Sequence, residues 1–344
     1  MELQRSPPNP VCPEPLDFAR ESLVEEPSSA GNLALSPEET SGASTSAAQA
    51  GVGQHAKSPF NLAPLVNGLS IDVEDWFQVG AFERTIPRAS WDSLESRVES
   101  NCDRALALFD AADVKATFFT LGWIAKRHPG VMRRIVEQGH ELASHGWDHT
   151  RVFTLDPPRF AEDLRRSRET LEDISGLAVT GYRAPSFSID ARNPWAHEVL
   201  AREGYAYSSS VAPIVHDHYG WREAPRFAFR PVVGSSLVEI PVTTAEFAGR
   251  RIAAGGGGFF RVLPYALTRW AIRQVNAQGR PAAFYFHPWE IDPEQPRVAN
   301  APLRSRLRHY TNLSGMEAKL RRLADEFAWG RMDALAAREA VLVP

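Results

Sequence analysis

The sequence has little cysteine and no long apolar run. Its two cysteines, in 344 residues, are Cys12, in a segment with the composition of a disordered chain, and Cys102, in a predicted helix. This usage supports neither a disulfide framework nor a cysteine metal site. The missing apolar runs exclude a membrane-spanning helix. Because no apolar core follows a basic start at the N-terminus, we also expect no signal peptide.

The chain also lacks an excess of basic charge. Its formal net charge is -4, which excludes the basic surface typical of nucleic-acid-binding proteins and a polybasic membrane patch. Hydrophobic residues make up 43% and charged residues 23% of the chain, as in globular proteins with a sizeable core. A length of 344 residues suffices for one large domain or two ordinary ones.

Two regions differ in composition. Residues 1–62 are rich in Ser, Pro, Ala, Gly and Glu, which predicts a disordered tail because too little apolar surface is available to order it. The remaining chain alternates between short apolar runs and helical patterns, which predicts a parallel sheet with helices outside, either a barrel or a doubly wound sheet. We expect strands at 68–72, 115–121, 140–144, 178–182, 205–208, 237–242 and 282–286, and helices at 91–114, 128–138, 157–174, 192–203, 264–278 and 316–327.

A pair of histidines, His145 and His149, ends the third of these strands. Each neutral imidazole has one nitrogen free to bind a borderline metal such as zinc, and residues four apart on one turn can face the same ion. Gly146 and Asp148 are poor helix formers, which places the pair on a turn. Gly146 also stands where a helical H-E-x-x-H metalloprotease has its glutamate, so that class is excluded. Two surface histidines at an accidental spacing are the alternative.

Three acidic residues, Asp72, Glu74 and Asp75, end the first strand. Alternation along an extended chain would send Asp72 and Glu74 to one side and Asp75 to the other, unless the strand has already turned. A hydrolytic metal site needs protein ligands, an open position for water, and a further carboxylate that can take the proton of the water. The cluster can supply one acid for each task, and a solvated acidic turn is the alternative.

Two more polar residues follow apolar strands. Arg183 can hold a carboxylate through two hydrogen bonds and so orient Asp72, and His287 can donate a proton to a leaving group. Taken singly, a surface arginine and a satisfied core histidine are the more common roles. Because the chemistry of such folds lies at the carboxyl ends of the strands, acid, imidazole and guanidinium groups at four strand ends predict an active site there.

A run of four glycines, residues 255–258, lacks the Gly-Lys-Ser/Thr ending of a P-loop. No helix is predicted to open on it at once, so we interpret it as a flexible loop beside the site. Several aromatic side chains near the motifs could stack on sugar faces, although packing in the core is the default for each. These are Trp76, Trp147, Trp289 and Phe259.

Assembled in this order, the motifs resemble those of the polysaccharide deacetylases of the NodB-homology type, carbohydrate esterase family four. That family has an acidic motif after the first strand, a His-x-x-x-His pair, an Arg-containing motif and a late histidine. The resemblance covers residues 67–330 and is closer to the subgroup from exopolysaccharide loci linked to exosortase and PEP-CTERM sorting. The closer match is carried by residues 70–77, 207–210, 216–220, 255–265, 286–290 and 308–313.

The resemblance implies a distorted (β/α) barrel that hydrolyses N-acetyl groups on a glycan with a bound metal. His145 and His149 would be metal ligands, and the catalytic residues would be Asp72 as general base, Arg183 as its orienting partner and His287 as general acid. The common family pattern Thr-Phe-Asp-Asp-Gly is replaced here by Asp-Val-Glu-Asp, so we expect Glu74 as the metal carboxylate and keep Asp75 as the alternative. Trp76, Pro185 and Trp289 are expected to contact the substrate.

A second departure from the family is Ser208, where many relatives have an aspartate near the late histidine. This leaves open which group tunes the pKa of His287. The expected domains are the barrel, 63–290, and a C-terminal extension packed on it, 291–344. Zinc is the expected metal, with cobalt, nickel, iron or manganese as alternatives.

The expected partner is an N-acetylated glycan, with no nucleic acid, and the sequence does not indicate the oligomeric state. Two other functions fit the same residues, namely hydrolysis of a small amide or cyclic imide, and non-catalytic glycan binding by a protein of the same fold. Because no export signal is visible, we expect a cytoplasmic location, with the bacterial envelope or periplasm as the alternative.

Overall fold

The computed structural model describes residues 65–215 and 219–343. The predicted tail at 1–62 and most of the motif at 216–220 lie outside these residues. The chain divides into two units, Met1–Pro59 and Phe60–Pro344, and the second contains every described residue.

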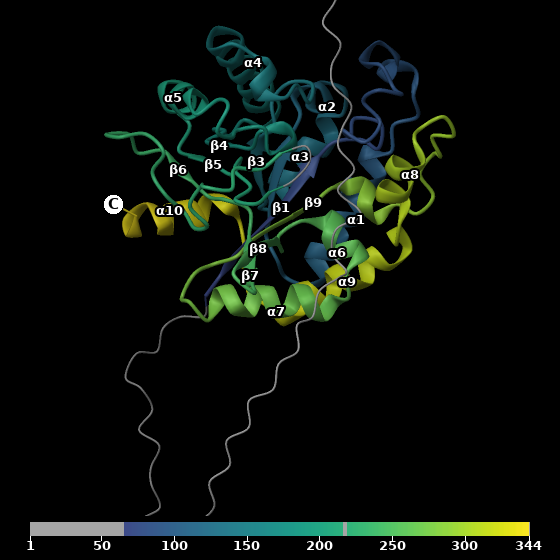
Figure 1. The fold of residues 1–344 in the computed structure, drawn as a ribbon. Coiled ribbons are helices and arrows are strands. Elements are labelled where there is room, and N and C mark those ends of the chain that lie inside the picture. The colour runs from purple at the N-terminus through teal and green to yellow at the C-terminus, as the bar shows by residue number, and fades with distance from the viewer. Residues whose placement is uncertain (1–64, 216–218, 344) are drawn as a thin grey trace, which may run out of the picture. The chain divides into compact units, whose positions relative to one another are not determined.

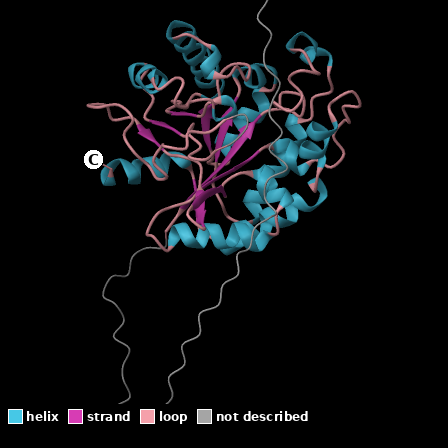
Figure 2. Cartoon of the chain, in the orientation of Figure 1, coloured by secondary structure: helices cyan, strands magenta, loops and turns pink. Residues whose placement is uncertain are grey.

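A curled parallel sheet forms the centre of the second unit, with helices around it (Figures 1 and 2). The strand order is β10-β1-β2-β3-β4-β5-β6, and β9 pairs with β1, so that β1 is the central strand. All seven residues of β1 are buried, as expected for a parallel strand covered on both faces. The strands of this sheet are β1 (Asn67–Val73), β2 (Thr117–Thr120), β3 (Glu141–Ser144), β4 (Gly181–Tyr182), β5 (Tyr207–Ser208), β6 (Val238–Glu239), β9 (Ala283–Phe286) and β10 (Trp329–Gly330).

The sheet curls until the chain after β6 meets β9. Thr243 donates its backbone N–H to the carbonyl of Ala283 at 3.2 Å, and Ala283 donates to the Thr243 hydroxyl at 2.6 Å. Farther along β9, Tyr285 donates to the carbonyl of Gly255 at 2.8 Å. These bonds bring the two sides of the curled sheet together, so the fold is the predicted distorted (β/α) barrel rather than an open doubly wound sheet.

The helices follow the apolar periodicity of the sequence. In α4, Phe160, Leu164 and Leu171 are buried, the Asp156 side chain accepts the N–H of Arg159 at its start, and Gly176 ends it with φ 70°. None of the helices in the described part of the chain is long and apolar enough to cross a membrane. The helices are α1 (Val98–Ala111), α2 (Gly122–Arg127), α3 (Pro129–Glu137), α4 (Pro157–Ser175), α5 (Trp195–Arg202), α6 (Gly257–Val262), α7 (Tyr265–Asn276), α8 (Leu303–Tyr310), α9 (Leu313–Glu326) and α10 (Met332–Leu342), with short 3-10 helices η1 (Arg88–Ser93), η2 (Val152–Thr154), η3 (Pro185–Phe187) and η4 (Pro288–Ile291).

Several elements differ from the sequence-based expectation. The helix expected from residue 91 begins only at Val98, because residues 88–93 form η1. A hairpin of β7 (Thr244–Phe247) and β8 (Arg250–Ala253) was not predicted, nor were α2, α6, α8 and α10. The interpretation of the glycine run as a loop without a helix is wrong, since α6 begins within it and buries Phe260 and Arg261. Tertiary packing here outweighs the low helix propensity of glycine.

The residues expected to form a C-terminal extension are joined to the barrel. β10 pairs with β1 through Asn67 and Gly68, and α9 packs against η4. Both belong to the same compact unit as the barrel. The boundary at residue 290 stays a prediction.

One buried carboxylate, that of Glu141 at the start of β3, holds the beginning of α10 against the sheet. It accepts hydrogen bonds from the Tyr207 hydroxyl at 2.8 Å and the Asp333 backbone N–H at 3.1 Å, and a third from the Thr117 hydroxyl. Burial, together with the charge of Asp333, raises the pKa of Glu141 to about 7. The protonated side chain is therefore favoured in the folded protein.

We predict that Glu141 makes the fold less stable as the pH rises from about 4.5 to about 7. In this window the folded protein binds more protons at Glu141 than the unfolded chain, so the free energy of unfolding falls, by up to about 3 kcal/mol. Urea unfolding at several pH values measures this slope, which we expect to flatten in Glu141→Gln. The exposed Glu137→Gln is the control, and an unchanged slope in Glu141→Gln would contradict the assignment.

Candidate active site

The polar residues singled out in the sequence meet at the carboxyl ends of neighbouring strands. Asp72 is the penultimate residue of β1 and Glu74 follows that strand directly. His145 follows β3, Arg183 follows β4 and His287 follows β9. Because β9, β1, β2, β3 and β4 pair in parallel in this order, their carboxyl ends form one rim of the sheet.

Glu74, His145 and His149 form a group that could hold a metal ion. One ligand atom from each lies within 4.8 Å of the other two, and no other group of this kind occurs among residues 65–215 and 219–343. The Glu74 Oε2 atom lies 2.9 Å from His149 Nε2, yet this oxygen is buried without a hydrogen bond. Two imidazoles and a carboxylate are ligand types that zinc accepts. An orphaned oxygen facing a ligand nitrogen fits a cation between them.

The pKa values of Glu74 and His145 are shifted toward the protonation states that bind metals. Burial would raise the pKa of Glu74, but the charges of His149 and His287 outweigh it and lower the pKa to about 2. Burial lowers the pKa of His145 to about 4, against the opposing charge of Asp72. At neutral pH the carboxylate is therefore ionised and the His145 ring is neutral, which are the forms that bind metals.

Backbone contacts orient the histidine pair. His145 Nδ1 lies 2.8 Å from the carbonyl oxygen of Arg183, and since a carbonyl only accepts, Nδ1 carries the proton and Nε2 is free. The chain turns at Gly146 with φ 75°, where a Cβ atom would lie 2.9 Å from the Asp163 carboxylate. Asp163 accepts the backbone N–H of Trp147 at 3.2 Å. This turn brings His149 back toward Glu74.

A buried ion pair lies beside this group. Arg183 Nη1 donates to Asp72 Oδ1 at 2.6 Å and to the Ser70 hydroxyl at 2.8 Å. Its other two nitrogens donate to the carbonyl and hydroxyl of Ser209, each at 2.9 Å. Both members of the pair are buried, with side chains 1% and 3% exposed. Only Nη1 of the guanidinium thus contacts Asp72, while the bonds to Ser70 and Ser209 fix the guanidinium itself, and Oδ2 of Asp72 accepts no hydrogen bond from the described residues.

Asp75 is turned away from Glu74, His145 and His149. Its position does not fit the alternative expectation that Asp75 is the metal carboxylate. Its carboxylate accepts the backbone N–H groups of Arg97 and Val98 at the start of α1 and the hydroxyl of Ser96. It also accepts the N–H of Trp76. The chain has already turned at the end of β1, where Glu74 N–H bonds the carbonyl of Asp72, so side-chain alternation no longer applies.

His287 completes the rim from the other side of β1. Its Nε2 lies 3.4 Å from Glu74 Oε1, and its Nδ1 lies 3.1 Å from Glu290 Oε2. Burial would lower the pKa of His287, but the charges of Glu74 and Glu290 outweigh it and raise the pKa to about 9. Sequence reasoning did not single out Glu290, although its spacing of three residues from His287 is the available signal.

The aromatic residues expected to contact substrate are buried. Trp76 is 4% and Trp289 is 6% exposed. Trp76 donates its indole N–H to the carbonyl of Glu95, and Trp289 is stacked between His287 and His309 at 5.1 and 4.2 Å. Their ring faces are therefore not available for a sugar, which corrects that prediction. Pro185 is also buried, at the start of η3.

A small cavity lies beside His149, next to the segment that follows β1. Two ion pairs join this segment to the chain around the histidine pair: Arg88 pairs with Asp148 at 2.9 Å, and Glu83 pairs with Arg151 at 2.7 Å. Sequence reasoning missed these residues because each is unremarkable by type and spacing. The cavity is lined by Phe77, Gln78, Gly80, Glu83, Ile86, Arg88, Trp91 and His149.

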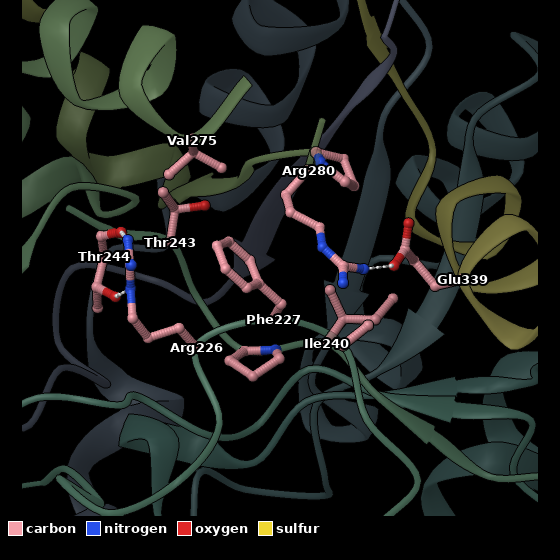
Figure 3. A pocket seen from close by; sticks show the side chains of 11 residues that line it. Arg226, Phe227, Ile240, Thr243, Thr244, Val275, Arg280 and Glu339 are labelled. Atoms are coloured by element: carbon pink, nitrogen blue, oxygen red, sulfur yellow. Dashed lines mark hydrogen bonds and ion pairs between the residues drawn. The ribbon is translucent and has the colours of Figure 1, made fainter. Parts of the chain in front are cut away.

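A second cavity contains none of the metal-binding or catalytic candidates (Figure 3). It lies between the chain preceding β9 and α10, where Arg280 pairs with Glu339 at 3.7 Å. Arg226, on another wall, donates to the carbonyl of Thr244 at 2.9 Å. The charged side chains of this cavity therefore have partners within the protein.

Comparison with known proteins finds similarity to polysaccharide deacetylases over part of the chain. Residues 89–207 match the polysaccharide deacetylase family, and residues 209–337 match a domain of unknown function, DUF3473. A peptidoglycan deacetylase from Helicobacter pylori is 30% identical over 113 residues, which are 33% of this chain and 38% of that protein. The chain thus matches less than half the length of this relative. These matches support the polysaccharide deacetylase family.

Two solved structures share the fold. A structure from Mycobacterium smegmatis, described as a candidate polysaccharide deacetylase, has a TM-score of 0.52 and 23% identity, with 84% of this chain and 96% of that chain covered. The allantoinase PuuE has a TM-score of 0.51 and 16% identity, with 78% and 88% covered. At these identities the likeness concerns the fold alone.

The geometry predicts that Glu74 and Asp75 differ in what they stabilise. Glu74→Gln should weaken zinc binding by about 10-fold or more, because a charged ligand is lost. Asp75→Asn should keep the zinc affinity and lower the free energy of unfolding by about 1 kcal/mol, since it weakens the hydrogen bonds at the start of α1. Calorimetric zinc titration and urea unfolding measure the two effects. Equal zinc affinity in Glu74→Gln and the unsubstituted protein would refute the ligand assignment.

Proposed function

We propose that this protein is a divalent-metal-dependent deacetylase that removes N-acetyl groups from a glycan, with an exopolysaccharide as the substrate and zinc as the metal. The observation that carries the proposal is the meeting of Glu74, His145 and His149 with a buried Asp72–Arg183 pair and with His287 at one rim of the barrel. A metal group, a base and an acid together are what metal-assisted amide hydrolysis requires. The proposed exosortase-linked subgroup rests on the motif resemblance.

Glu74, His145 and His149 would hold the cation. Cobalt, nickel, iron or manganese would suit the same ligand types. A cation bound there supplies Lewis-acid chemistry, because it polarises a carbonyl and makes water more acidic.

Asp72 acts as the general base. Its Oδ1 is held by Arg183, so Oδ2 takes the proton of the attacking water. The guanidinium fixes the carboxylate in one orientation, because every one of its nitrogens is held by Asp72, Ser70 or Ser209. Because the base is preorganised, the reaction requires no free energy to reorient it.

His287 acts as the general acid. Its Nε2 faces the ligand Glu74, and a proton held there passes to the amide nitrogen as the carbon–nitrogen bond breaks. Asp72 thereby takes one proton of the water, the oxygen and the other proton of the water become part of acetic acid, and the amine receives its proton from His287. Transfer of a proton from Asp72 to His287 through solvent restores both groups. The Helicobacter relative, a peptidoglycan deacetylase, supports an N-acetylated sugar as the source of the amide.

Removal of the metal should abolish acetate release. We expect chelation to stop release from N-acetylglucosamine oligomers and from N-acetylated exopolysaccharide, and stoichiometric zinc to restore it. His145→Ala and His149→Ala should lose both zinc and activity, because each removes one of the ligand groups. His128→Ala, outside this group, is the control. Metal analysis and an acetate assay decide the matter, and full activity of the chelated protein would show that no metal is needed.

Substitution of the base should separate metal binding from turnover. Asp72→Asn should retain zinc and the substrate KM while kcat falls by about 1,000-fold, within the range that general acid–base catalysis contributes. The exposed Asp103→Asn is the control, because Asp103 pairs with Arg134 on the surface. Steady-state kinetics with metal analysis measures the separation. A fully active Asp72→Asn protein would exclude Asp72 as the base.

A further inference from the structure

The proposed acid, His287, lacks the aspartate that many relatives place near it. Ser208 stands at that position, and its hydroxyl is engaged elsewhere, donating to the Ser210 hydroxyl at 2.8 Å. Some other group must therefore orient the His287 ring.

The contacts of Glu290 show that it holds the ring of His287. It lies on η4, three residues after His287, and is fully buried. Its Oε2 accepts the backbone N–H of His287 at 3.0 Å and lies 3.1 Å from the ring Nδ1. Since an ionised carboxylate only accepts, Nδ1 donates to it, and Nε2 is left pointing toward Glu74. One oxygen thus fixes both the backbone and the ring of His287.

Arg261 holds the other oxygen of Glu290. Its Nε donates to Glu290 Oε1 at 2.7 Å, and the guanidinium is buried, with the side chain 2% exposed. Nη1 donates to the carbonyls of His309 and Thr311 at 2.9 and 2.8 Å, and Nη2 to that of Arg308 at 3.2 Å. The carboxylate that orients His287 is therefore anchored on the end of α8.

The glycine run explains how the carboxylate fits. A Cβ atom at Gly257 would lie 2.0 Å from Glu290 Oε2, so any side chain there would displace the carboxylate. Gly257 has no positive φ, so glycine is required here by space rather than by backbone conformation. The run that the sequence analysis interpreted as a flexible loop makes room for Glu290 at Gly257.

We infer that Glu290 is a positioning residue for His287, and that segment 209–337 provides the acid half of the active site by holding Glu290 between Gly257 and Arg261. This inference rests on the proposed function. His145 and Arg183 lie in the segment that matches the polysaccharide deacetylase family, whereas His287 and its whole support lie in the segment that matches a domain of unknown function. That second segment thereby gains a chemical role.

The inference is tested by a double-mutant cycle on the zinc-loaded protein. Glu290→Gln should lower kcat on N-acetylglucosamine oligomers by about 100-fold with KM and zinc content unchanged, because the ring of His287 loses its charged anchor. In the His287→Gln background the same change should alter kcat by less than about twofold, since a residue that acts through His287 has nothing left to orient. Equal losses in both backgrounds would overturn the inference.

Asp292→Asn is the matched control. Asp292 is a buried, ion-paired carboxylate two residues further on, but it bonds Arg97 and Asn101 and does not contact His287. We expect this change to lower the thermal unfolding temperature and to leave kcat within about twofold. A loss of kcat equal to that of Glu290→Gln would mean that the whole turn acts by stability alone, and would overturn the inference.

A second measurement does not need activity. In protein labelled with ¹⁵N-histidine, the Nδ1-bound proton of His287 should be protected from solvent exchange, and its signal should move in Glu290→Gln and Gly257→Ala but not in Asp292→Asn. If the protein releases no acetate yet these shifts appear, the proposed function fails while the positioning role stands. If the signal is unmoved in Glu290→Gln, the positioning role fails, whatever the activity.

Discussion

Burying the carboxylate of Glu74 costs free energy unless positive charge surrounds it, and the site is built around that requirement. Glu74 directly follows the central strand β1, and its partners His149 and His287 follow β3 and β9. His149 and His287 approach it from opposite sides, at 2.9 and 3.4 Å. The oxygen Oε2 has His149 Nε2 as its near neighbour at 2.9 Å, an arrangement that suits the proposed cation site.

The two proposed proton-transfer groups are held by similar devices. Asp72 is fixed by the buried Arg183, whose other bonds go to Ser70 and Ser209, and His287 is fixed by Glu290. In each case the support includes a buried ion pair, Arg183–Asp72 or Arg261–Glu290. Burying such a pair costs desolvation free energy, and here it fixes the orientation of the proton-transfer group. The base and its partner come from β1 and β4, while the acid and its support come from the last third of the chain. The proposed active site therefore needs both parts of the chain.

Much of this could be predicted from the sequence. Apolar runs alternating with helical periods predicted a parallel sheet, and polar residues directly after those runs predicted the rim that carries Asp72, His145, Arg183 and His287. Such predictions succeed because they depend on local composition and on one general property of parallel sheets, that their carboxyl ends meet. Short elements such as α6 and the β7–β8 hairpin were missed because their local propensity is weak and packing decides them.

The sequence by itself determined the order of the strands along the chain and the chemical types at their ends, since residue type and periodicity are local. Only the tertiary structure showed where the two carboxylates lie, because the turn after β1 sends Glu74, which the sequence analysis favoured, to the histidines and Asp75 to the start of α1. It also decided that Trp76 and Trp289 are buried. The contact of Glu290 with Arg261 joins residues that are 29 positions apart in the sequence. The spacing of residue types along the chain does not predict a contact of this kind.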